Sequence, residues 1–371
     1  MTRIVLKNIV KNIRGKNIFN DLNLEIESRE VTVFLGPVGA GKTTLFKIIA
    51  GTESVDSGKI YFDDVEVTKL PPQKRDVAMV FQNFALYPHL SIFENIASPL
   101  RVKKYHENEI KKRVNEIAEL LNIKHILDKK PHECSGGESQ RASIARALAK
   151  NPKIYLFDEP LTNLDYKVRE VLRFELKKLF KEVGATVLYS TSNPEEAAAL
   201  GSRLAYIRNG QVLQTGAVLD CFRKPFDIDA ASHYSLFGIN LFEGYCKIID
   251  SRKFLVIDDL FEVDVSDHKF LESGNEYFIG IYPHDLKLRK SSNEDIQIPI
   301  SVDFLENMGS ELIVVARSGN FIVRLLVSGL ENLSELMNLT SAYVPLSRLL
   351  IFSKENRKLL KGDMPLGRNT N

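Results

Sequence analysis

Residues 36–44, GPVGAGKTT, decide the fold of this chain. The stretch fits the pattern G-x-x-x-x-G-K-[ST], and it lies between the apolar run EVTVFLG (residues 30–36) and TTLFKIIAG (residues 43–51). The first run predicts a buried strand, and the second predicts a helix that ends just before Gly51. Glycines in such a turn let backbone N–H groups face phosphate oxygens, helped by the helix N-terminus. The stretch therefore predicts a phosphate-binding loop in an α/β domain.

Two carboxylates follow a second apolar run, IYLFDE (residues 154–159). We expect Lys42 to reach the β- and γ-phosphates of a nucleotide, and the Thr43 hydroxyl and Asp158 to ligate Mg²⁺. Glu159 would polarise the attacking water. An Asp-Glu pair at a strand end is usually a solvated edge, but the loop upstream favours the catalytic interpretation. The expected nucleotide contacts of the loop are Gly36, Pro37, Val38, Gly39, Ala40, Gly41, Lys42, Thr43 and Thr44.

Length and composition indicate a soluble protein of two or three domains, since the chain has 371 residues. Lys plus Arg (50) nearly balances Asp plus Glu (48), so no global basic field favours nucleic acid. No run approaches the roughly 18 apolar residues of a membrane span. Three widely spaced cysteines argue against a disulfide framework. A cytoplasmic location is expected.

The pattern of apolar residues predicts two domains. Strand and helix signals alternate through residues 1–236, as in an α/β layer fold, with a helical subdomain inserted at about residues 84–150. Within the insert, residues 106–122 predict a helix whose apolar stripe consists of Ile110, Val114, Ile117, Leu120 and Leu121. Asn209-Gly210 predicts a hairpin turn. Residues 237–371 favour short strands and predict a β-rich domain with a frayed polar tail at residues 361–371.

Residues 134–138, CSGGE, open a further predicted helix. Ser135 suits the N-cap, and two glycines at a helix N-terminus also suit an anion site. Together with the two motifs above, this segment resembles the signature of ATP-binding cassette (ABC) ATPases. PHECSGGESQRASIARALAKNPKIYLFDEPLTNLD (residues 131–165) is nearly continuous family pattern. FQNFALYPHLSIFENI (residues 81–96) is similar to the segment around the family's Q-loop.

The resemblance implies a composite ATP site in a head-to-tail dimer. ATP would lie between the phosphate loop of one subunit and the signature of the other. Gln82 matches the glutamine that touches Mg²⁺ and senses the γ-phosphate. Residues lent to the partner's site would be Ser135, Gly136, Gly137, Glu138 (usually Gln in the family) and the D-loop aspartate Asp165.

Membrane permease subunits would dock near residues 84–95, where Phe84, Leu86, Tyr87 and Phe93 offer apolar and aromatic contacts. For any single one of these four, a place in the core is an equally good alternative.

The second domain also resembles a family pattern. GIYPHDLKL (residues 280–288) and VDFLENMGSELIVVARSGNFIVRLL (residues 302–326) are similar to the C-terminal oligonucleotide-binding-like (OB) domains of sugar, polyamine and anion importer ATPases. The name describes a barrel-like fold, because aromatic and basic residues do not interleave here as in a single-strand binder. The resemblance implies an importer ATPase at the cytoplasmic face of a membrane, working with two permease subunits and an extracytoplasmic solute-binding protein.

Two positions depart from the family pattern. In LYSTSNPEEA (residues 188–197), Ser192 stands where the family usually has a switch histidine that contacts the γ-phosphate. Serine carries no positive charge near neutral pH, and loss of such a group costs about 10²–10³ in rate. Ile13 stands where the family often stacks an aromatic ring on adenine, and its loss costs on the order of 1 kcal/mol of affinity. The residues lent to a partner are intact.

The function expected from these motifs is ATP hydrolysis, with Mg²⁺, that drives uptake of a small solute. ENIASPL and EPLTNLDYKVREVL resemble glycerol or polyol importers that use two different ATPase subunits. We therefore expect a heterodimer in which this chain's own site is slow. One alternative is a nucleotide-sensing subunit beside a complete sister ATPase. Another, a soluble ABC protein acting on DNA or ribosomes, is disfavoured because the chain has neither two cassettes nor long coiled-coil insertions, and its net charge is near zero.

Overall fold

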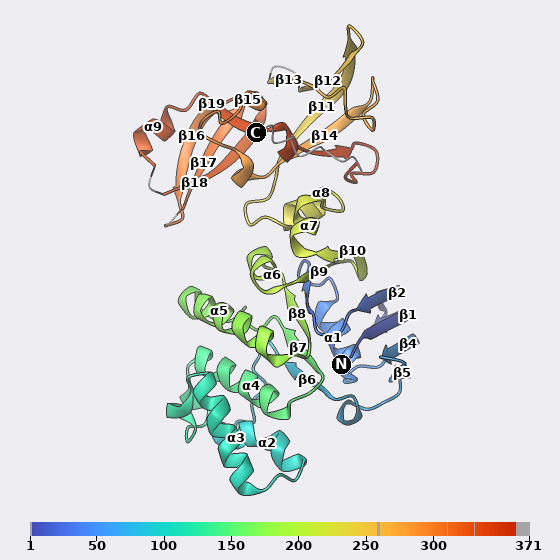
Figure 1. Cartoon of the computed structure of the whole chain (residues 1–371), viewed down its shortest axis with the longest axis vertical. Coiled ribbons are helices and arrows are strands. Elements are labelled where there is room, and N and C mark those ends of the chain that lie inside the picture. Colours follow the sequence, from blue (N-terminus) through green and yellow to red (C-terminus); the bar gives the residue numbers. More distant parts are fainter. Residues whose placement is uncertain (1, 258–259, 310, 330, 361–371) are drawn as a thin grey trace, which may run out of the picture. The chain divides into compact units, whose positions relative to one another are not determined.

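The computed structural model describes residues 2–257, 260–309, 311–329 and 331–360 (Figure 1). The chain forms two compact units, Met1–Cys221 and Phe222–Asn371. The tail that we expected to be frayed, residues 361–371, lies outside the described residues. The first unit carries the predicted phosphate loop, and the second is the β-rich part of the chain.

A six-stranded sheet forms the centre of the first unit, with strand order β10-β9-β3-β8-β7-β6. Five strands are parallel, and β10 runs antiparallel to β9. Strands β3, β7 and β8 are almost entirely buried, as expected of parallel strands covered on both faces. The strands are β3 (Val31–Leu35), β6 (Val77–Val80), β7 (Ile154–Asp158), β8 (Thr186–Thr191), β9 (Arg203–Arg208) and β10 (Gln211–Ala217).

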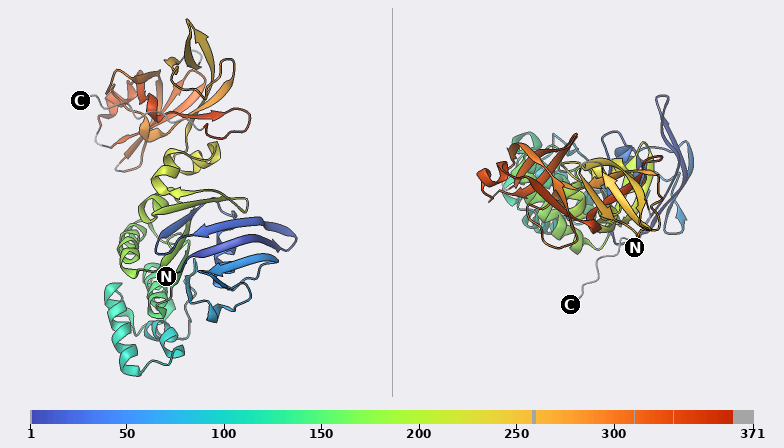
Figure 2. Two further views of the ribbon diagram at one scale, coloured as in Figure 1. Left: turned by 45° about the vertical axis from the view of Figure 1, so that its right-hand side comes forward. Right: turned by 90° about the horizontal axis from the view of Figure 1, so that it is seen from above.

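The two faces of this sheet are covered by different elements. Helix α1 (Lys42–Ala50) and an antiparallel sheet of order β2-β1-β4-β5 share one hydrophobic core with the first face. Helix α5 (Tyr166–Val183) covers the second face, where the ring of Phe180 lies 5.0 Å from that of Phe157. Helix α6 (Pro194–Leu200) packs beside α5 and on β3. Figure 2 shows the layers from two further sides. The antiparallel strands are β1 (Ile4–Ile13), β2 (Lys16–Ile26), β4 (Ser57–Phe62) and β5 (Val65–Glu66).

The helical subdomain lies between β6 and β7, as predicted. Its helices are α2 (Ile92–Val102), α3 (Glu107–Leu120) and α4 (Gly136–Lys150). Helix α3 buries Ile110, Val114 and Ala118. The prediction for Leu120 was wrong, because that side chain is 53% exposed. At 100° per residue, position 120 lies about 80° around the helix from position 110, outside the buried stripe.

The predicted hairpin joins β9 to β10. Both turn residues, Asn209 (φ 51°) and Gly210 (φ 73°), have positive φ, which is the conformation that an Asn-Gly type I′ turn requires.

Three small sheets surround one core in the second unit, which confirms the expected β-rich fold. Their strand orders are β13-β12-β11-β14-β20, β15-β19 and β16-β17-β18. Residues 222–236, which the sequence pattern grouped with the first domain, pack in this unit, where Ile228 and Ala231 contact Tyr282 and Phe352. Helix α7 (Val218–Arg223) contains the boundary between the two units, and the short helices of the second unit are α8 (Ile228–His233) and α9 (Leu333–Met337). The strands are β11 (Asn240–Ile249), β12 (Arg252–Ile257), β13 (Phe261–Asp264), β14 (Glu276–Ile281), β15 (Asp295–Pro299), β16 (Ser301–Asn307), β17 (Glu311–Ser318), β18 (Phe321–Ser328), β19 (Ser341–Pro345) and β20 (Leu350–Ser353).

Candidate nucleotide site

The loop after β3 leads directly into α1. Gly41 precedes the helix with φ 105°, a left-handed conformation that side chains rarely adopt. A Cβ atom there would also lie 2.9 Å from the ring of Phe19. At the start of the loop, a Cβ on Gly36 would lie 2.0 Å from the carbonyl oxygen of Ile207. The spacing of glycines in GPVGAGKTT therefore meets steric demands of the fold as well as the demands of a phosphate cradle.

Lys42 joins the phosphate loop to the end of β7. Its ammonium group donates hydrogen bonds to the carbonyl oxygens of Gly36 (2.7 Å) and Pro37 (3.0 Å). It also forms an ion pair with Glu159, with Nζ 3.1 Å from Oε1. The Lys42 side chain is 4% exposed and that of Glu159 is 13% exposed, so solvent screens this pair only weakly. The expected phosphate ligand and the expected catalytic carboxylate therefore lie together.

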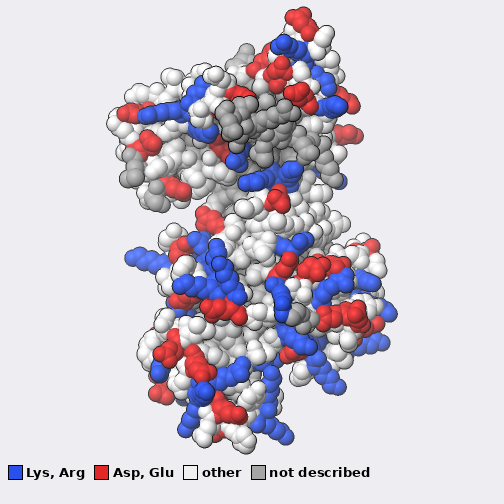
Figure 3. All heavy atoms as spheres, in the orientation of Figure 1, with Lys and Arg blue, Asp and Glu red and all other residues white. Residues whose placement is uncertain are grey.

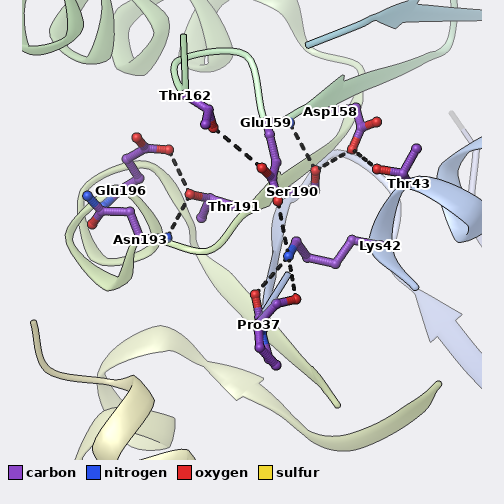
Figure 4. A network of polar contacts seen from close by, with 11 residues as sticks. Pro37, Lys42, Thr43, Asp158, Glu159, Thr162, Ser190, Thr191, Asn193 and Glu196 are labelled. Atoms are coloured by element: carbon purple, nitrogen blue, oxygen red, sulfur yellow. Dashed lines mark hydrogen bonds and ion pairs between the residues drawn. The ribbon is translucent and has the colours of Figure 1, made fainter. Parts of the chain in front are cut away.

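Thr43 and Asp158 form a second link between the two motifs. The Thr43 hydroxyl donates to Asp158 Oδ1 at 3.1 Å across 115 residues of sequence. Asp158 is 3% exposed, and burial raises its pKa, while hydrogen bonds from Ser190 and Thr43 oppose that shift. Figure 4 shows these groups converging from α1, β7 and β8.

Ser190 was not among the predicted site residues, yet it contacts both carboxylate residues. Its hydroxyl donates to Asp158 Oδ1 at 2.8 Å and accepts from the backbone N–H of Glu159 at 3.0 Å. The only sequence signal was a hydroxyl in the otherwise apolar end of ATVLYS (residues 185–190). Thr162 was also missed, and its hydroxyl donates to Glu159 Oε2 at 3.4 Å.

Ser192 follows β8 and is half-buried. The side chains of its two neighbours in sequence, Thr191 and Asn193, are held by hydrogen bonds. Thr191 accepts a hydrogen bond from the backbone of Asn193 and donates one to the buried Glu196 at 2.8 Å. Asn193 caps α6 by accepting from the N–H groups of Glu195 and Glu196. Position 192 therefore lies in a turn between two residues whose side chains are held by hydrogen bonds.

The signature segment forms the N-terminus of α4. Ser135 is the N-cap and accepts from the N–H of Glu138, while Glu138 Oε2 accepts from the N–H of Ser135 at 2.7 Å. This capping box lowers the pKa of Glu138, chiefly through the backbone hydrogen bond. Glu138 Oε1 also lies 3.2 Å from His125 Nε2. Among the described residues, no hydrogen bond or ion pair joins residues 135–138 to residues 36–44.

The remaining predicted residues lie around this centre. Gln82 is exposed, and its carbonyl oxygen accepts from Asn163 Nδ2 at 3.3 Å. Asp165 caps α5 by accepting from the N–H of Val168 at 3.0 Å. Ile13 is half-buried at the end of β1, next to the turn that leads into β2.

The predicted docking segment is held by Asn95, which is fully buried. The Asn95 amide oxygen accepts a hydrogen bond from the backbone N–H of Tyr87 (2.8 Å), and its amide nitrogen donates one to the carbonyl oxygen of Tyr87 (3.1 Å). Tyr87 is 48% exposed, whereas Phe84, Leu86 and Phe93 are half-buried. Of the four, Tyr87 presents the most open side chain.

Comparison with known proteins identifies the family. The family model for ABC transporters matches residues 19–162. The sn-glycerol-3-phosphate import ATP-binding protein of Pectobacterium atrosepticum is 36% identical over 328 residues, which cover 88% of this chain and 91% of that protein. The trehalose/maltose import ATP-binding protein of Thermococcus litoralis is 37% identical over 316 residues, covering 81% of this chain and 84% of that protein. The chain belongs to the ABC transporter family.

Solved structures of ABC cassettes have the same fold. The dimeric post-hydrolysis state of the ATP-binding cassette MJ0796, bound to ADP and Pi, matches with a TM-score of 0.53 and 33% identity. The match covers 58% of this chain and 98% of that one. The ABC fold predicted from the motifs is confirmed, and it carries an additional β-rich C-terminal unit. No helix among the described residues is long and apolar enough to span a membrane.

Proposed function

We propose that this chain is the ATP-binding, energy-coupling subunit of an ABC importer, which hydrolyses ATP at a head-to-tail dimer interface to drive solute uptake. The observation that supports this most is the cluster in which Lys42 pairs with Glu159 at 3.1 Å and Thr43 bonds Asp158 at 3.1 Å. The cluster combines a phosphate ligand, a metal-binding carboxylate and a base for water. The relatives named above import sn-glycerol-3-phosphate and trehalose or maltose, so a small sugar or polyol is the solute class that we favour.

In this proposal, the residues of the cluster have separate roles in ATP hydrolysis. Lys42 supplies positive charge to the β- and γ-phosphates, and the loop N–H groups and the N-terminus of α1 bind the remaining oxygens. Glu159 orients and polarises water for attack on the γ-phosphate. Because Lys42 now bonds two loop carbonyls and Glu159, phosphate oxygens would have to replace these partners.

The same cluster fits Mg²⁺. This ion prefers oxygen ligands from one or two protein groups together with substrate phosphates. Thr43 Oγ1 and Asp158 are such a pair, already adjacent at 3.1 Å, and Gln82 is the further ligand that we expect. When bound with ATP, Mg²⁺ neutralises phosphate charge.

The carboxylate of Glu159 provides the direct test. Glu159→Gln keeps the shape but removes the base, so we expect ATP binding to persist while phosphate release falls about 10²–10³-fold. Lys42→Ala should remove both binding and turnover. Nucleotide binding by calorimetry and phosphate release by a coupled assay measure the two effects. Full hydrolysis by Glu159→Gln would contradict the proposed role.

Coupling to a membrane is part of the same proposal. We place the chain at the cytoplasmic face of the membrane, with two permease subunits docked at residues 84–95, an extracytoplasmic solute-binding protein in the complex, and regulation by residues 237–371. The exposed side chain of Tyr87, whose backbone is held by the buried Asn95 amide, supports the docking site. Tyr87→Ala should reduce co-purification with the permease while leaving ATP binding by the isolated chain unchanged. Unreduced co-purification would remove residue 87 from the interface.

A second candidate function follows from Ser192. A chain without the switch histidine could bind ATP mainly as a nucleotide sensor, beside a sister ATPase that has the histidine. The reduced stacking expected of Ile13 supports the same view. Turnover by the purified chain alone, compared with turnover in the presence of the sister subunit, distinguishes the two candidates.

Positively and negatively charged side chains are mixed over the face of the molecule seen in Figure 3. Neither candidate function involves nucleic acid.

A further inference from the structure

Ser190 is a buried residue in the strand next to the candidate site. It lies in β8, which pairs with β3 on one side through Phe34 and with β7 on the other through Asp158. The residue is fully buried. Neighbouring strands on both sides therefore fix its backbone, and with it the direction of its Cβ atom. Ser190 belongs to neither of the motifs that define the site.

The Ser190 hydroxyl uses both its donor and its acceptor capacity on the site. A hydroxyl has one hydrogen to donate, and here it goes to Asp158 Oδ1 at 2.8 Å. The oxygen accepts from the N–H of Glu159 at 3.0 Å, and the Ser190 carbonyl oxygen accepts from the same N–H at 3.1 Å. Glu159 has φ 44°, a strained conformation for a residue with a side chain. One hydroxyl therefore holds a carboxylate and also supports the strained peptide beside it (Figure 4).

Among the described residues, one other hydroxyl donates to Asp158 Oδ1, that of Thr43 at 3.1 Å. In the proposed function, Thr43 turns its oxygen to the metal, which leaves Ser190 as the hydroxyl that still orients Asp158. Groups that orient a metal ligand typically change metal affinity or activity by about 10–100-fold when they are removed.

We propose that Ser190 is a positioning residue of this site: its buried hydroxyl fixes the Asp158 carboxylate and the Glu159 backbone in the arrangement that binds the divalent cation of the nucleotide complex. The inference rests on the proposed function. It assigns part of the site's metal affinity to a residue in β8, outside the phosphate loop and outside IYLFDE.

A buried hydroxyl can also matter only for stability, and β8 provides a matched control for that role. Thr186, at the other end of the same strand, is 1% exposed and donates to the carbonyl oxygen of Thr2 at 2.7 Å, away from the site. Thr186→Val removes a buried hydroxyl from β8 without touching Asp158. If lost stability alone mattered, Ser190→Ala and Thr186→Val would affect the site alike.

The experiment measures ADP binding by calorimetry on the full chain, with and without Mg²⁺, and Mn²⁺ binding to the ADP complex by electron paramagnetic resonance. For Ser190→Ala we expect Mn²⁺ affinity to fall at least about tenfold, with metal-free ADP affinity within about twofold of wild type. Thr186→Val should match wild type in both. Ser190→Cys, which keeps a weak donor of similar size, should lie between wild type and Ser190→Ala.

Three outcomes would overturn the inference. The first is unchanged Mn²⁺ affinity in Ser190→Ala. The second is an equal loss in Thr186→Val. The third is a parallel loss of metal-free and metal-dependent affinity, which would indicate general damage to the pocket. A wild-type chain that binds no nucleotide would overturn the proposed function itself, which separates that failure from failure of Ser190 alone.

Discussion

At the scale of single residues, two serines near the end of β8, Ser190 within the strand and Ser192 just after it, have opposite expected effects. Ser190 faces the carboxylates and bonds both Asp158 and Glu159. Ser192, two positions later, stands where the family pattern has a histidine. Ser192 lies in the turn between the end of β8 and the start of α6. The turn that holds it is fixed by Thr191 and Asn193.

Ser192→His should therefore raise turnover at this chain's own site. A histidine here would add a hydrogen-bond donor that can carry positive charge near the γ-phosphate, worth up to about 10²–10³-fold in kcat, the loss expected from its absence. Phosphate release at saturating Mg-ATP measures the effect. Ser192→Asn adds a donor without charge and serves as the comparison. If the two variants turn over ATP equally, the charge of the histidine is not what the site lacks.

At the scale of elements, the contact between α4 and α5 determines how tightly the signature segment packs. A Cβ on Gly137 would lie 2.7 Å from Val168 Cγ1, whereas a Cβ on the adjacent Gly136 would lie 3.5 Å from Leu164 Cδ2. The first separation is too short for real atoms, and the second is an ordinary contact. Valine is stiff at χ1, so Val168 cannot easily move away.

Gly137→Ala should therefore destabilise the first unit by about 1–3 kcal/mol, because an added methyl group overpacks the α4–α5 contact. Gly136→Ala provides the matched control and should be neutral or stabilising by up to about 1 kcal/mol, because alanine favours the helix. Thermal or denaturant unfolding followed by circular dichroism measures both. Equal effects at the two positions would show that the Val168 contact does not limit the packing of α4.

In the second unit, a turn before β15 surrounds Asp295 with donors. Burial raises the pKa of Asp295. Hydrogen bonds from the N–H and hydroxyl of Ser291 and the N–H of Ser292 outweigh that effect and lower the pKa to about 2. The folded pKa thus lies below the unfolded value of 3.8. The resulting stability is complete above the unfolded pKa and is lost as the pH falls from 3.8 toward 2.

Asp295→Asn should lower the stability of the second unit at pH 7 and make a much smaller difference near pH 2, where about half of the wild-type carboxylate is protonated. Denaturant titrations of both proteins at several pH values between 2 and 7 would reveal the converging curves. A stability difference that stays constant over this range would show that the charge of Asp295 contributes nothing, and that only its shape matters.

The elements that the sequence predicted well are those whose signals are local. The strand–loop–helix of residues 30–51, the Asn209-Gly210 hairpin and the insert between β6 and β7 all followed from short patterns. Ser190 could not be found in this way, because its contact with Asp158 depends on β8 lying beside β7 in the sheet order. Leu120 was misplaced because apolar character at the end of a helix does not fix which face is buried. Residues 222–236 belong to the second unit because they pack with Tyr282 and Phe352, and these contacts between residues distant in sequence leave no local pattern.

At the scale of the whole molecule, the proposed function assigns the phosphate loop and the signature segment to two different nucleotide pockets. The loop, Asp158 and Glu159 form one cluster, while the capped N-terminus of α4 shares no hydrogen bond with the phosphate loop among the described residues. In a head-to-tail dimer, Ser135 would serve the partner's nucleotide and Lys42 this chain's own. Under the proposal that Ser192 and Ile13 weaken only this chain's own site, we expect its contribution to the partner's pocket to matter more than its own ATP binding.

This asymmetry gives a prediction for the assembled complex of this chain with a sister ATPase that has the switch histidine. Ser135→Arg in this chain places a bulky side chain in the partner's pocket and should lower turnover of the complex by about tenfold or more. Lys42→Ala in this chain impairs a site that is already slow, so turnover should fall less than about twofold. Lys112→Ala, which removes an exposed lysine from α3, is the control for loss of a positive charge.

Phosphate release by the reconstituted complex, with and without transported solute, measures all three variants. The reverse order, with Lys42→Ala inhibiting more than Ser135→Arg, would show that this chain's own pocket performs most of the hydrolysis. Turnover by the purified chain alone at the rate of the complex would contradict the asymmetric heterodimer directly. A homodimer would then need no sister subunit, and Ser192 would be compatible with full activity because the remaining charges, Lys42 foremost, suffice to stabilise the transition state.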